Sequence, residues 1–298
     1  MRVGFIGIGK MGKPMAANVL KGGFEVVVSP AYGNEKPAAE LEAMGAKSVP
    51  TVKEIIQQSD VIVTVLNADK NIDDVYLGAD GVSTWAKNGT ICIEMTTAKG
   101  ETVKKLAEKL EALGKGIKLI DAPVSGGTAG AEAGALTIML GGNDQDIAAV
   151  AEILNCMGKK HFKCGGIGSG KTIKMLNQML NAGSMAVACE TIYLGKKLGI
   201  DTDLLQEVVN ESSGASWVFK NNVPKFLLAE NFEGGFVLDL MAKDISLAVG
   251  EIESNGLKLP LTEQVYAILK DTQDEGLGSK NYTIIKKYTE KVNGEGVK

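Results

Sequence analysis

The chain begins with a short β-rich run that leads into three glycines. Residues 2–6 precede Gly7, Gly9 and Gly12, and a helical pattern follows at residues 15–20. Glycines let a backbone turn tightly and approach a pyrophosphate, while the free N–H groups and the dipole at a helix N-terminus favour negative charge. A glycine triplet alone also fits an ordinary strand-to-helix turn. Here strand, turn and helix follow in the required order, so the segment predicts a dinucleotide-binding unit.

Strand-like and helical patterns continue to alternate through the first half of the chain. Alternation of this kind predicts an α/β Rossmann fold with a doubly wound parallel sheet. Further strands are expected at residues 24–29, 61–66, 91–95, 119–122 and 161–164, and further helices at residues 38–44, 102–113 and 146–157. Ligands of such sheets bind beyond the carboxyl ends of the strands, which places the loops at residues 67–69, 96–100 and 123–130 beside the ligand.

The second half reads as helical. A glycine-rich segment at residues 165–170 opens a helical pattern at about residues 168–196, roughly 40 Å long if unbroken. Later helices are expected at residues 204–209, 239–254, 261–270 and 282–292. We therefore predict a Rossmann domain at residues 1–165 and an all-α domain at residues 166–298, joined by the long interdomain helix.

Charge and composition exclude several classes of partner. The net charge of −4 opposes binding to nucleic acid, and no basic patch offsets it. The four cysteines lack the paired spacing of a zinc site or a redox dithiol, so we predict reduced thiols and no metal. No signal peptide precedes the first strand, and polar residues interrupt the most apolar helix, so a cytoplasmic protein without a membrane span is expected.

Lys174 is the candidate for proton transfer. It stands at i, i+3 and i+4 with Asn177 and Gln178, the spacing that places side chains on one helical face. A lysine on such a helix can also extend its charge into solvent. His161 is the only histidine and Arg2 the only arginine, so few other groups are available for acid–base chemistry or for gripping a carboxylate. The polar neighbours and this scarcity favour the catalytic interpretation.

Four motifs in order give the chain its resemblance to a known family. They are GFIGIGKMGKPMA at residues 4–16, DAPVSGGTAGAEAGALTIMLGG at 121–142, GIGSGKTIKMLNQ at 166–178 and FVLDLMAKDISLA at 236–248. Over essentially its whole length the chain resembles the β-hydroxyacid dehydrogenases, the relatives of 3-hydroxyisobutyrate dehydrogenase and tartronate semialdehyde reductase. The segment at residues 212–219 most resembles the 2-(hydroxymethyl)glutarate and threonate dehydrogenase branches.

The resemblance implies a role for individual residues. Lys174 matches the catalytic lysine, and Lys243 and Asp244 match a closing motif whose lysine approaches the cofactor. Matches to substrate-binding positions are Thr96, Ser125, Gly126, Gly127, Asn177 and Gln178. The cofactor-binding residues that we predict are Gly7, Ile8, Gly9, Lys10, Met11, Gly12, Leu66, Asn67, Thr96 and Lys243.

The implied function is an NAD(P)-dependent oxidoreductase acting on a small 3-hydroxy acid, as a homodimer or homotetramer built through the helical domain. Two alternatives stay open at this point. One is a non-catalytic dinucleotide-binding or interaction module of the same fold. The other is decarboxylating chemistry of the 6-phosphogluconate type, for which an arginine-poor chain is poorly equipped. Trp217 and Phe219 are expected either to narrow the substrate pocket or to pack in the core.

The choice between NAD and NADP is open, because neither of the usual determinants follows the second strand. An acidic residue there would hold the ribose hydroxyls of NAD, and an arginine would hold the 2′-phosphate of NADP. This chain has Ser29, Pro30, Ala31 and Tyr32 instead, with Asn34 and Lys36 shortly after.

We therefore expect weak discrimination between the two cofactors, less than about a hundredfold in kcat/KM, because no buried charge rejects the wrong ribose. Both kcat/KM values should be measured at one ionic strength and again with Lys36→Ala. A preference above about a thousandfold would contradict the prediction.

Overall fold

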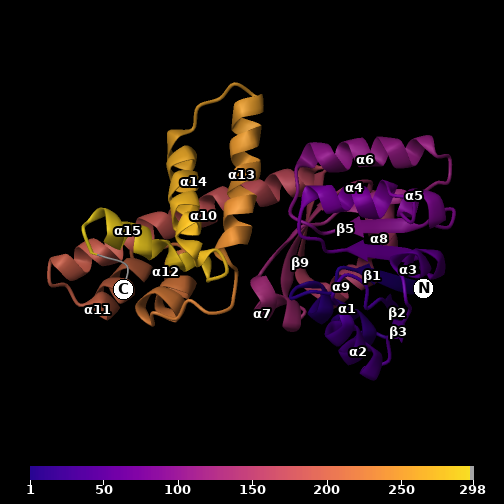
Figure 1. Cartoon of the computed structure of the whole chain (residues 1–298), viewed down its shortest axis with the longest axis horizontal. Coiled ribbons are helices and arrows are strands. Elements are labelled where there is room, and N and C mark those ends of the chain that lie inside the picture. Colours follow the sequence, from indigo (N-terminus) through magenta and orange to yellow (C-terminus); the bar gives the residue numbers. More distant parts are fainter. Residues whose placement is uncertain (296–298) are drawn as a thin grey trace. The chain divides into compact units, whose positions relative to one another are not determined.

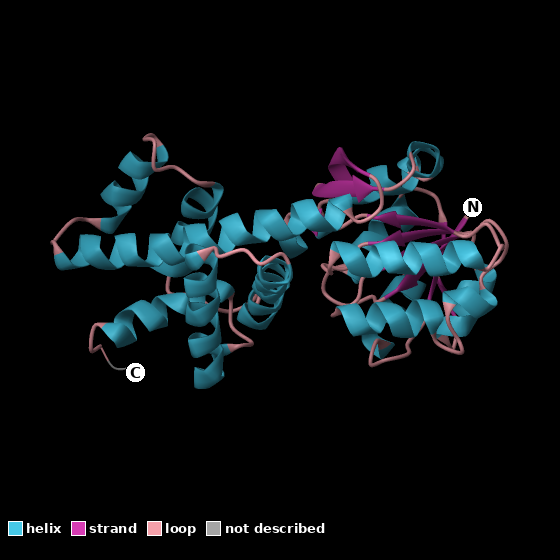
Figure 2. Ribbon diagram, turned by 90° about the horizontal axis from the view of Figure 1, so that it is seen from above, coloured by secondary structure: helices cyan, strands magenta, loops and turns pink. Residues whose placement is uncertain are grey.

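The computed structural model describes residues 1–295 of the chain. The chain divides into two compact units, Met1–Lys174 and a second unit that begins at Met175. Figure 2 shows the strands gathered in the first unit, while helices make up the described part of the second. This is the expected order of a Rossmann-like unit followed by a helical one.

The first unit is built on one sheet, which has nine strands within the described residues. The strands are β1 (Arg2–Ile6), β2 (Glu25–Val28), β3 (Lys47–Ser48), β4 (Val61–Thr64), β5 (Ile91–Glu94), β6 (Lys118–Asp121), β7 (Val124–Ser125), β8 (Leu136–Gly141) and β9 (Gly158–Gly165). Their order is β3-β2-β1-β4-β5-β6-β8-β7, with β9 paired to β8. The chain leaves β1 toward β2 and later returns to β4 on the other side of β1. That reversal creates the crevice in which sheets of this kind bind ligands.

In the central strands, alternate residues enter two different cores. In β2, Val26 and Val28 pack into one hydrophobic cluster, whereas Val27 packs into the other. One cluster is covered by α1 (Gly12–Lys21), α2 (Glu35–Ala43), α7 (Gly127–Glu132), α8 (Asp144–Ala149) and α9 (Ala151–Met157). The other is covered by α3 (Val52–Gln58), α4 (Asp69–Leu77), α5 (Val82–Trp85) and α6 (Gly100–Ala112). Figure 1 shows α6 and α4 across the sheet from α1 and α2. Burial on both faces explains why the strands read as continuous apolar runs.

The sheet is mixed at one end, where the sequence predicts only parallel strands. β8 runs antiparallel to β6 and β7 and parallel to β9. The sequence prediction contains no strand at β8, because this short run is buried on nearly every residue and lacks a period of two. The predicted helix at residues 146–157 is two helices, α8 and α9, which meet at Val150 in a non-helical conformation. The helices α3, α4 and α5 also lie outside the sequence prediction.

The long helix α10 runs from Ser169 to Lys197, close to the range predicted from sequence. Its first turn is tied to the sheet by Asp121 at the end of β6. One carboxylate oxygen of Asp121 accepts a 2.6 Å hydrogen bond from Gly168 N, and the other accepts a 2.9 Å bond from Lys171 N. A carboxylate is favourable at this place, because the first N–H groups of a helix have no partner within the helix. In the described part of the chain no helix has the length and apolar character of a membrane span.

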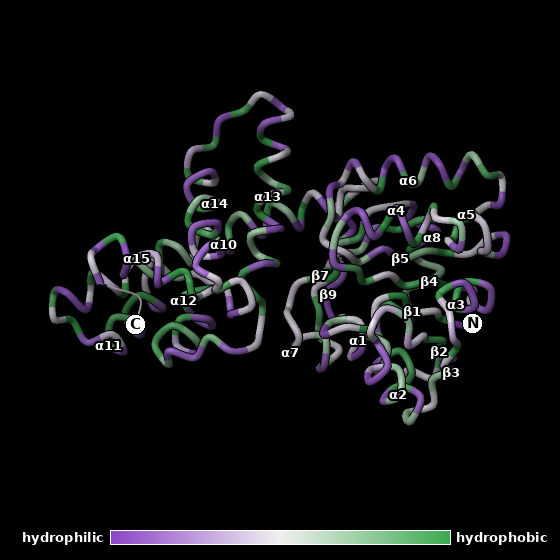
Figure 3. The backbone as a smooth tube through the Cα atoms, viewed as in Figure 1, coloured by the Kyte–Doolittle hydropathy of each residue, from purple (hydrophilic) through white to green (hydrophobic). Residues whose placement is uncertain are grey.

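The second unit packs later helices against α10. These elements are α11 (Thr202–Asn210), α12 (Trp217–Asn222), η1 (Val223–Leu228), α13 (Leu238–Ser254), α14 (Pro260–Thr272), η2 (Gln273–Leu277), η3 (Tyr282–Ile285) and α15 (Lys286–Val292). Met185 of α10 and Met241 and Ile245 of α13 belong to its buried core. Figure 3 shows the mixture of hydrophobic and hydrophilic positions along α13 and α14. Phe219 packs in this core, whereas the side chain of Trp217 is 66% exposed.

The four cysteines differ in their access to solvent, which gives a test of the fold. Cys92 and Cys189 are buried, while Cys156 and Cys164 are half-buried. Burial raises the pKa of Cys92 to about 12 and also raises the pKa of Cys189. We expect Cys92 and Cys189 to react with a thiol reagent only after unfolding, because the thiolate is the reactive form. Timed alkylation followed by peptide mass spectrometry, native against denatured, checks this; fast labelling of Cys92 in the native protein would contradict it.

Candidate active site

Each glycine of the turn after β1 meets a different geometric demand. Gly7 has φ +91, and a Cβ there would lie 2.1 Å from the carbonyl oxygen of Val65. A Cβ on Gly12 would lie 1.9 Å from the carbonyl oxygen of Gly7. At Gly9, by contrast, a Cβ would meet nothing within 4 Å. Gly7 and Gly12 therefore serve the turn and its packing, while Gly9 leaves the backbone open to an approaching ligand. These are the three roles of a pyrophosphate-binding turn.

The start of α1 suits an anion. Its first turn holds no acidic residue, and no side chain caps it at Met11. The N–H groups and the positive end of the helix dipole are thus available at the place where a pyrophosphate binds in this fold. The residues present fit a dinucleotide at this end of the sheet.

The loop after β2, where the ribose determinant normally lies, is held together by its own polar groups. Ser29 Oγ donates to Pro50 O at 3.1 Å and accepts from Ala31 N at 3.1 Å. The side-chain amide of Asn34 donates to Ala31 O at 2.8 Å. Tyr32 is exposed in the left-handed backbone region, at φ +61. Lys36 is exposed in the first turn of α2. Ser29 and Asn34 are therefore engaged in shaping the loop.

Thr96 is buried just beyond β5, and its hydroxyl, N–H and carbonyl groups each take part in a hydrogen bond. Its hydroxyl accepts a 2.9 Å hydrogen bond from Leu66 N, which follows β4. Its own N–H donates to Glu94 Oε1 at 3.0 Å, and its carbonyl oxygen accepts from the Lys171 ammonium. The structure thus brings Thr96 together with Leu66 at the carboxyl ends of two neighbouring strands.

The segment from Ser125 to Gly127 forms a turn between β7 and α7. Gly126 and Gly127 have φ values of +134 and +62, in the region that favours glycine. Gly126 and Gly127 are exposed, and Ser125 is half-buried. The turn offers backbone N–H groups and one hydroxyl near the start of a helix, an arrangement that can receive a carboxylate.

Lys174 is buried on α10, with 7% of its surface exposed. The alternative in which this lysine extends into solvent is therefore wrong. Burial disfavours a charged ammonium unless polar groups compensate for the lost water. Lys174 belongs to the same compact unit as the glycine turn, Thr96 and the Ser125–Gly127 turn.

Asn177 and Gln178 follow on α10, in the helical unit. Asn177 Nδ2 donates to Gln178 Oε1 at 3.2 Å, and Gln178 Nε2 donates to Asp244 Oδ2 at 2.7 Å. The other oxygen of the Asp244 carboxylate pairs with Lys243 Nζ at 3.0 Å. A polar chain therefore links α10 to α13, and it includes both residues of the lysine–aspartate motif.

Two buried charged residues next to the candidate site, Lys171 and Glu94, were not predicted from the sequence. Lys171 and Glu94 have 0% exposure and form an ion pair. The signals were present, because Lys171 precedes Lys174 by one helical turn and Glu94 ends an apolar strand. Pattern alone could not show that residues 77 positions apart meet.

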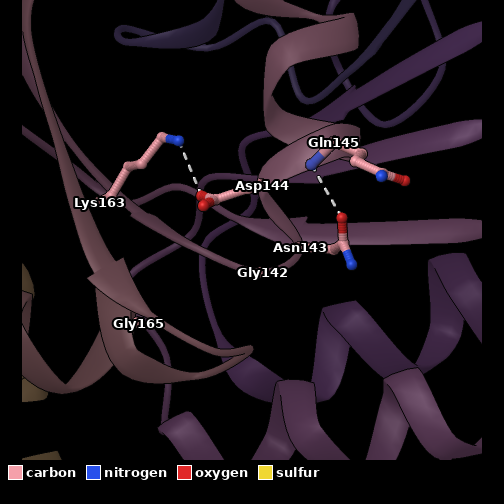
Figure 4. A pocket seen from close by; sticks show the side chains of 6 residues that line it. All are labelled: Gly142, Asn143, Asp144, Gln145, Lys163 and Gly165. Carbon is pink, nitrogen blue, oxygen red and sulfur yellow. Dashed lines mark hydrogen bonds and ion pairs between the residues drawn. The ribbon is translucent and has the colours of Figure 1, made fainter.

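A surface hollow lies elsewhere on the first unit, between the β8–α8 connection and β9. It is lined by Gly142, Asn143, Asp144, Gln145, Lys163 and Gly165. Figure 4 shows its two polar contacts, a 2.8 Å ion pair between Lys163 and Asp144 and a 2.8 Å hydrogen bond from Gln145 N to Asn143 Oδ1. None of these six residues belongs to the predicted site. The two charged side chains of the hollow, Lys163 and Asp144, are paired with each other.

Comparison with known families covers both units. Residues 2–166 match the NAD binding domain of 6-phosphogluconate dehydrogenase, and residues 168–289 match the model described as NAD-binding of NADP-dependent 3-hydroxyisobutyrate dehydrogenase. The 2-(hydroxymethyl)glutarate dehydrogenase of Eubacterium barkeri is 35% identical over 297 residues, which cover 100% of this chain and 97% of that protein. The chain belongs to the 3-hydroxyisobutyrate dehydrogenase family. It is an NAD(P)-dependent oxidoreductase of the 3-hydroxyacid dehydrogenase type.

Further relatives agree with this membership. The human mitochondrial 3-hydroxyisobutyrate dehydrogenase is 35% identical over 289 residues, covering 95% of this chain and 85% of that protein. Among solved structures, a Mycobacterium tuberculosis 3-hydroxyisobutyrate dehydrogenase with L-serine superposes with a TM-score of 0.87 at 27% identity, covering 97% of this chain and 98% of that one. The Rossmann-like fold and the helical second half are thereby confirmed. By family, the substrate is a small hydroxy acid.

The contrast between Gly9 and Gly12 gives a paired test of the dinucleotide turn. Gly9→Ala should leave the melting temperature within about 2 °C, since its methyl group meets no protein atom, but weaken dinucleotide binding by about tenfold or more. Gly12→Ala should lower the melting temperature instead, because its methyl group overlaps the Gly7 carbonyl. Thermal unfolding and NADH fluorescence titration measure the two effects. Unchanged affinity in Gly9→Ala would contradict the assignment.

Proposed function

We propose that this protein interconverts a small 3-hydroxy acid and its semialdehyde or keto form, with Lys174 as the proton-transfer group. The observation that carries the proposal is the burial of Lys174, on a helix whose first turn is hydrogen-bonded to Asp121 at the same carboxyl edge of the sheet as the glycine turn. A lysine held there is shielded from bulk water and has a fixed approach to a bound substrate. Proton transfer by a positioned side chain contributes about a hundredfold to ten-thousandfold in rate.

The substrate class follows from chemistry that the relatives share. 2-(Hydroxymethyl)glutarate and 3-hydroxyisobutyrate, named in two relatives, each carry a carboxylate and a hydroxyl on the third carbon. L-serine, present with the Mycobacterium tuberculosis relative, has the same two groups in the same relation. We propose a substrate of this kind, with threonate and tartronate semialdehyde as the other members of the test panel.

The reaction needs a hydride acceptor and a proton acceptor. A dinucleotide held by the turn from Gly7 to Gly12 would supply the hydride transfer to and from the carbinol carbon of the substrate. Lys174, as the neutral amine, removes the proton from the substrate hydroxyl. In the reverse direction its ammonium donates a proton to the oxygen of the carbonyl group that is being reduced.

The substrate carboxylate is assigned to the Ser125–Gly127 turn. Ser125 offers a hydroxyl, and Gly126 and Gly127 offer backbone N–H groups without side chains that would block approach. This device suits a chain whose single arginine, Arg2, pairs with Glu25 at 2.8 Å instead. Thr96 is proposed to contact both substrate and cofactor, because its hydroxyl retains a hydrogen to donate while it accepts from Leu66.

Asn177 and Gln178 are proposed to help place the substrate. Asn177 is the more direct candidate, because Gln178 uses its amide on Asp244 and its oxygen on Asn177. The hydrogen-bonded chain to Asp244 would then hold Asn177 in one orientation.

The cofactor is assigned to the turn Gly7, Ile8, Gly9, Lys10, Met11 and Gly12, with Leu66, Asn67 and Thr96 beyond the next strands and Lys243 from the helical unit. Both NAD and NADP are kept as candidates, because the loop after β2 holds neither an acidic group nor an arginine. A homodimer or homotetramer formed through the helical unit and a cytoplasmic location stay predictions from the sequence. Light scattering and cell fractionation test them.

Replacing Lys174 tests the proposal directly. We expect Lys174→Met, which keeps the length and apolar body of the side chain, to lower kcat by about a hundredfold or more. The chain's single histidine, His161, lies on β9 and not on the helix that carries Lys174. NADH binding should stay within about threefold of the wild-type value. Initial rates with the hydroxy-acid panel and fluorescence titration measure the two quantities; an active Lys174→Met variant would refute the assignment.

Ser125→Ala is the matched control in the same site. It removes one hydrogen bond to the carboxylate but no proton-transfer group, so it should raise the KM for the hydroxy acid more than the KM for the cofactor. Equal changes in both KM values would show that this turn does not select the substrate.

A further inference from the structure

Lys171 lies fully buried in the first turn of α10, one turn before Lys174. Its ammonium has three N–H groups, and three acceptors surround it. They are the Glu94 carboxylate, the Glu94 carbonyl oxygen at 2.9 Å and the Thr96 carbonyl oxygen. A buried ammonium is costly unless polar groups compensate for the lost water, and here two hydrogen bonds and one ion pair do so. All three acceptors belong to the short segment that ends β5.

Glu94 extends this contact across the sheet end. Its Oε1 accepts from Thr96 N at 3.0 Å and from the Thr64 hydroxyl at 3.4 Å, and that hydroxyl in turn contacts the hydroxyl of Tyr76 at 3.0 Å. Burial raises the pKa of Tyr76, so its hydroxyl stays protonated beside the carboxylate. The carboxylate therefore connects the ends of β4 and β5 through groups that are all buried.

The same lysine is also held through its backbone. Lys171 N donates to Asp121 at the end of β6, while its side chain reaches the end of β5. The first turn of α10 is thus fixed to two neighbouring strands at once. Lys174 follows three residues later, on a similar face of the helix.

An ion pair is not needed here for stability alone. Well-packed apolar residues of similar volume stabilise a core as well as a buried ion pair or better. Apolar side chains, however, would remove the Lys171 donor from the Thr96 carbonyl oxygen and leave the Glu94 carbonyl oxygen only its 2.8 Å bond from Ala122 N. What the pair supplies is a fixed geometry for the Thr96 turn relative to α10.

We propose that Lys171 and Glu94 are positioning residues for the reaction, because together they hold the Thr96 hydroxyl and the Lys174 side chain in one fixed relation. Neither touches the reacting atoms. The inference rests on the proposed roles of Thr96 and Lys174. Displacement of a reacting group by about 1 Å costs on the order of a hundredfold in rate, so the loss of this geometry should appear in kcat.

Two double variants separate positioning from simple stability. Lys171→Met/Glu94→Gln and Lys171→Gln/Glu94→Gln both remove the two charges and have side chains of similar size. They differ in that Lys171→Gln keeps N–H donors for the carbonyl oxygens of residues 94 and 96, whereas Lys171→Met keeps none. We expect the double variant with Lys171→Met to lose about tenfold or more in kcat and the one with Lys171→Gln to stay within about threefold of wild type. The NADH dissociation constant should change by less than kcat in both, because the glycine turn is untouched and Thr96 is only one of the proposed cofactor contacts.

Rates are measured with the most active hydroxy acid of the panel at saturating cofactor, beside melting temperatures for each protein. Equal kcat values in the two double variants would overturn the proposal. So would a kcat that falls only in proportion to the folded fraction. Lys197→Met is the control, because it removes a lysine from an exposed ion pair with Glu295 at the other end of α10 and should leave kcat unchanged.

A measurement on the wild-type protein covers the case in which a double variant does not fold. The Thr96 amide hydrogen should exchange as slowly as the amides inside β5, because Glu94 Oε1 accepts it in a buried site. Exchange at the rate of an open loop would overturn the proposal. The experiments also distinguish a failure of the proton-transfer role of Lys174 from a failure of the positioning role of Lys171 and Glu94. An active Lys174→Met variant removes the proposed function, whereas an inactive one with equal double variants removes only the positioning role.

Discussion

The carboxylate of Asp121 is the contact on which the arrangement of the site depends. It lies buried at the end of β6 and accepts the N–H groups of Gly168 and Lys171. A helix start without such an acceptor would leave these groups unsatisfied in a dry environment. Asp121 therefore fixes where α10 begins. The positions of Lys171 and Lys174 depend on that start, since both lie in the first two turns of the helix.

The other candidate site residues lie at the end of the sheet for a different reason. Parallel strands place all their carboxyl ends at one edge, and the loops that follow must lie there. The glycine turn follows β1, Leu66 follows β4 and Thr96 follows β5. Hydrogen bonds between these loops then replace water as partners for the loop backbone. The Thr96 hydroxyl accepts from Leu66 N, and the Glu94 carboxylate accepts from Thr96 N. Loops that are hydrogen-bonded to one another before a ligand arrives lose less entropy on binding.

Each of the two units contributes part of the candidate site. The first unit contains the dinucleotide turn and Lys174, while the helical unit holds the lysine–aspartate pair and the amides after Lys174. Two hydrogen bonds form the polar chain from Asn177 through Gln178 to Asp244. Such buried chains specify one arrangement of two helices more strictly than apolar contacts do, because a shift leaves polar groups unpaired. The chain from Asn177 to Asp244 therefore fixes α10 against α13 within the helical unit.

Local pattern in the sequence determined the glycine turn, most of the parallel strands and the long helix, because backbone sterics and side-chain periodicity act over a few residues. It also placed Lys174, Asn177 and Gln178 on one helix. It did not predict β8, whose nearly complete burial removes the period of two, nor the break at Val150. The pairing of Lys171 with Glu94 was decided by tertiary structure. Residues 77 positions apart meet there because the chain crosses the sheet between them, and only that meeting makes a buried charge tolerable.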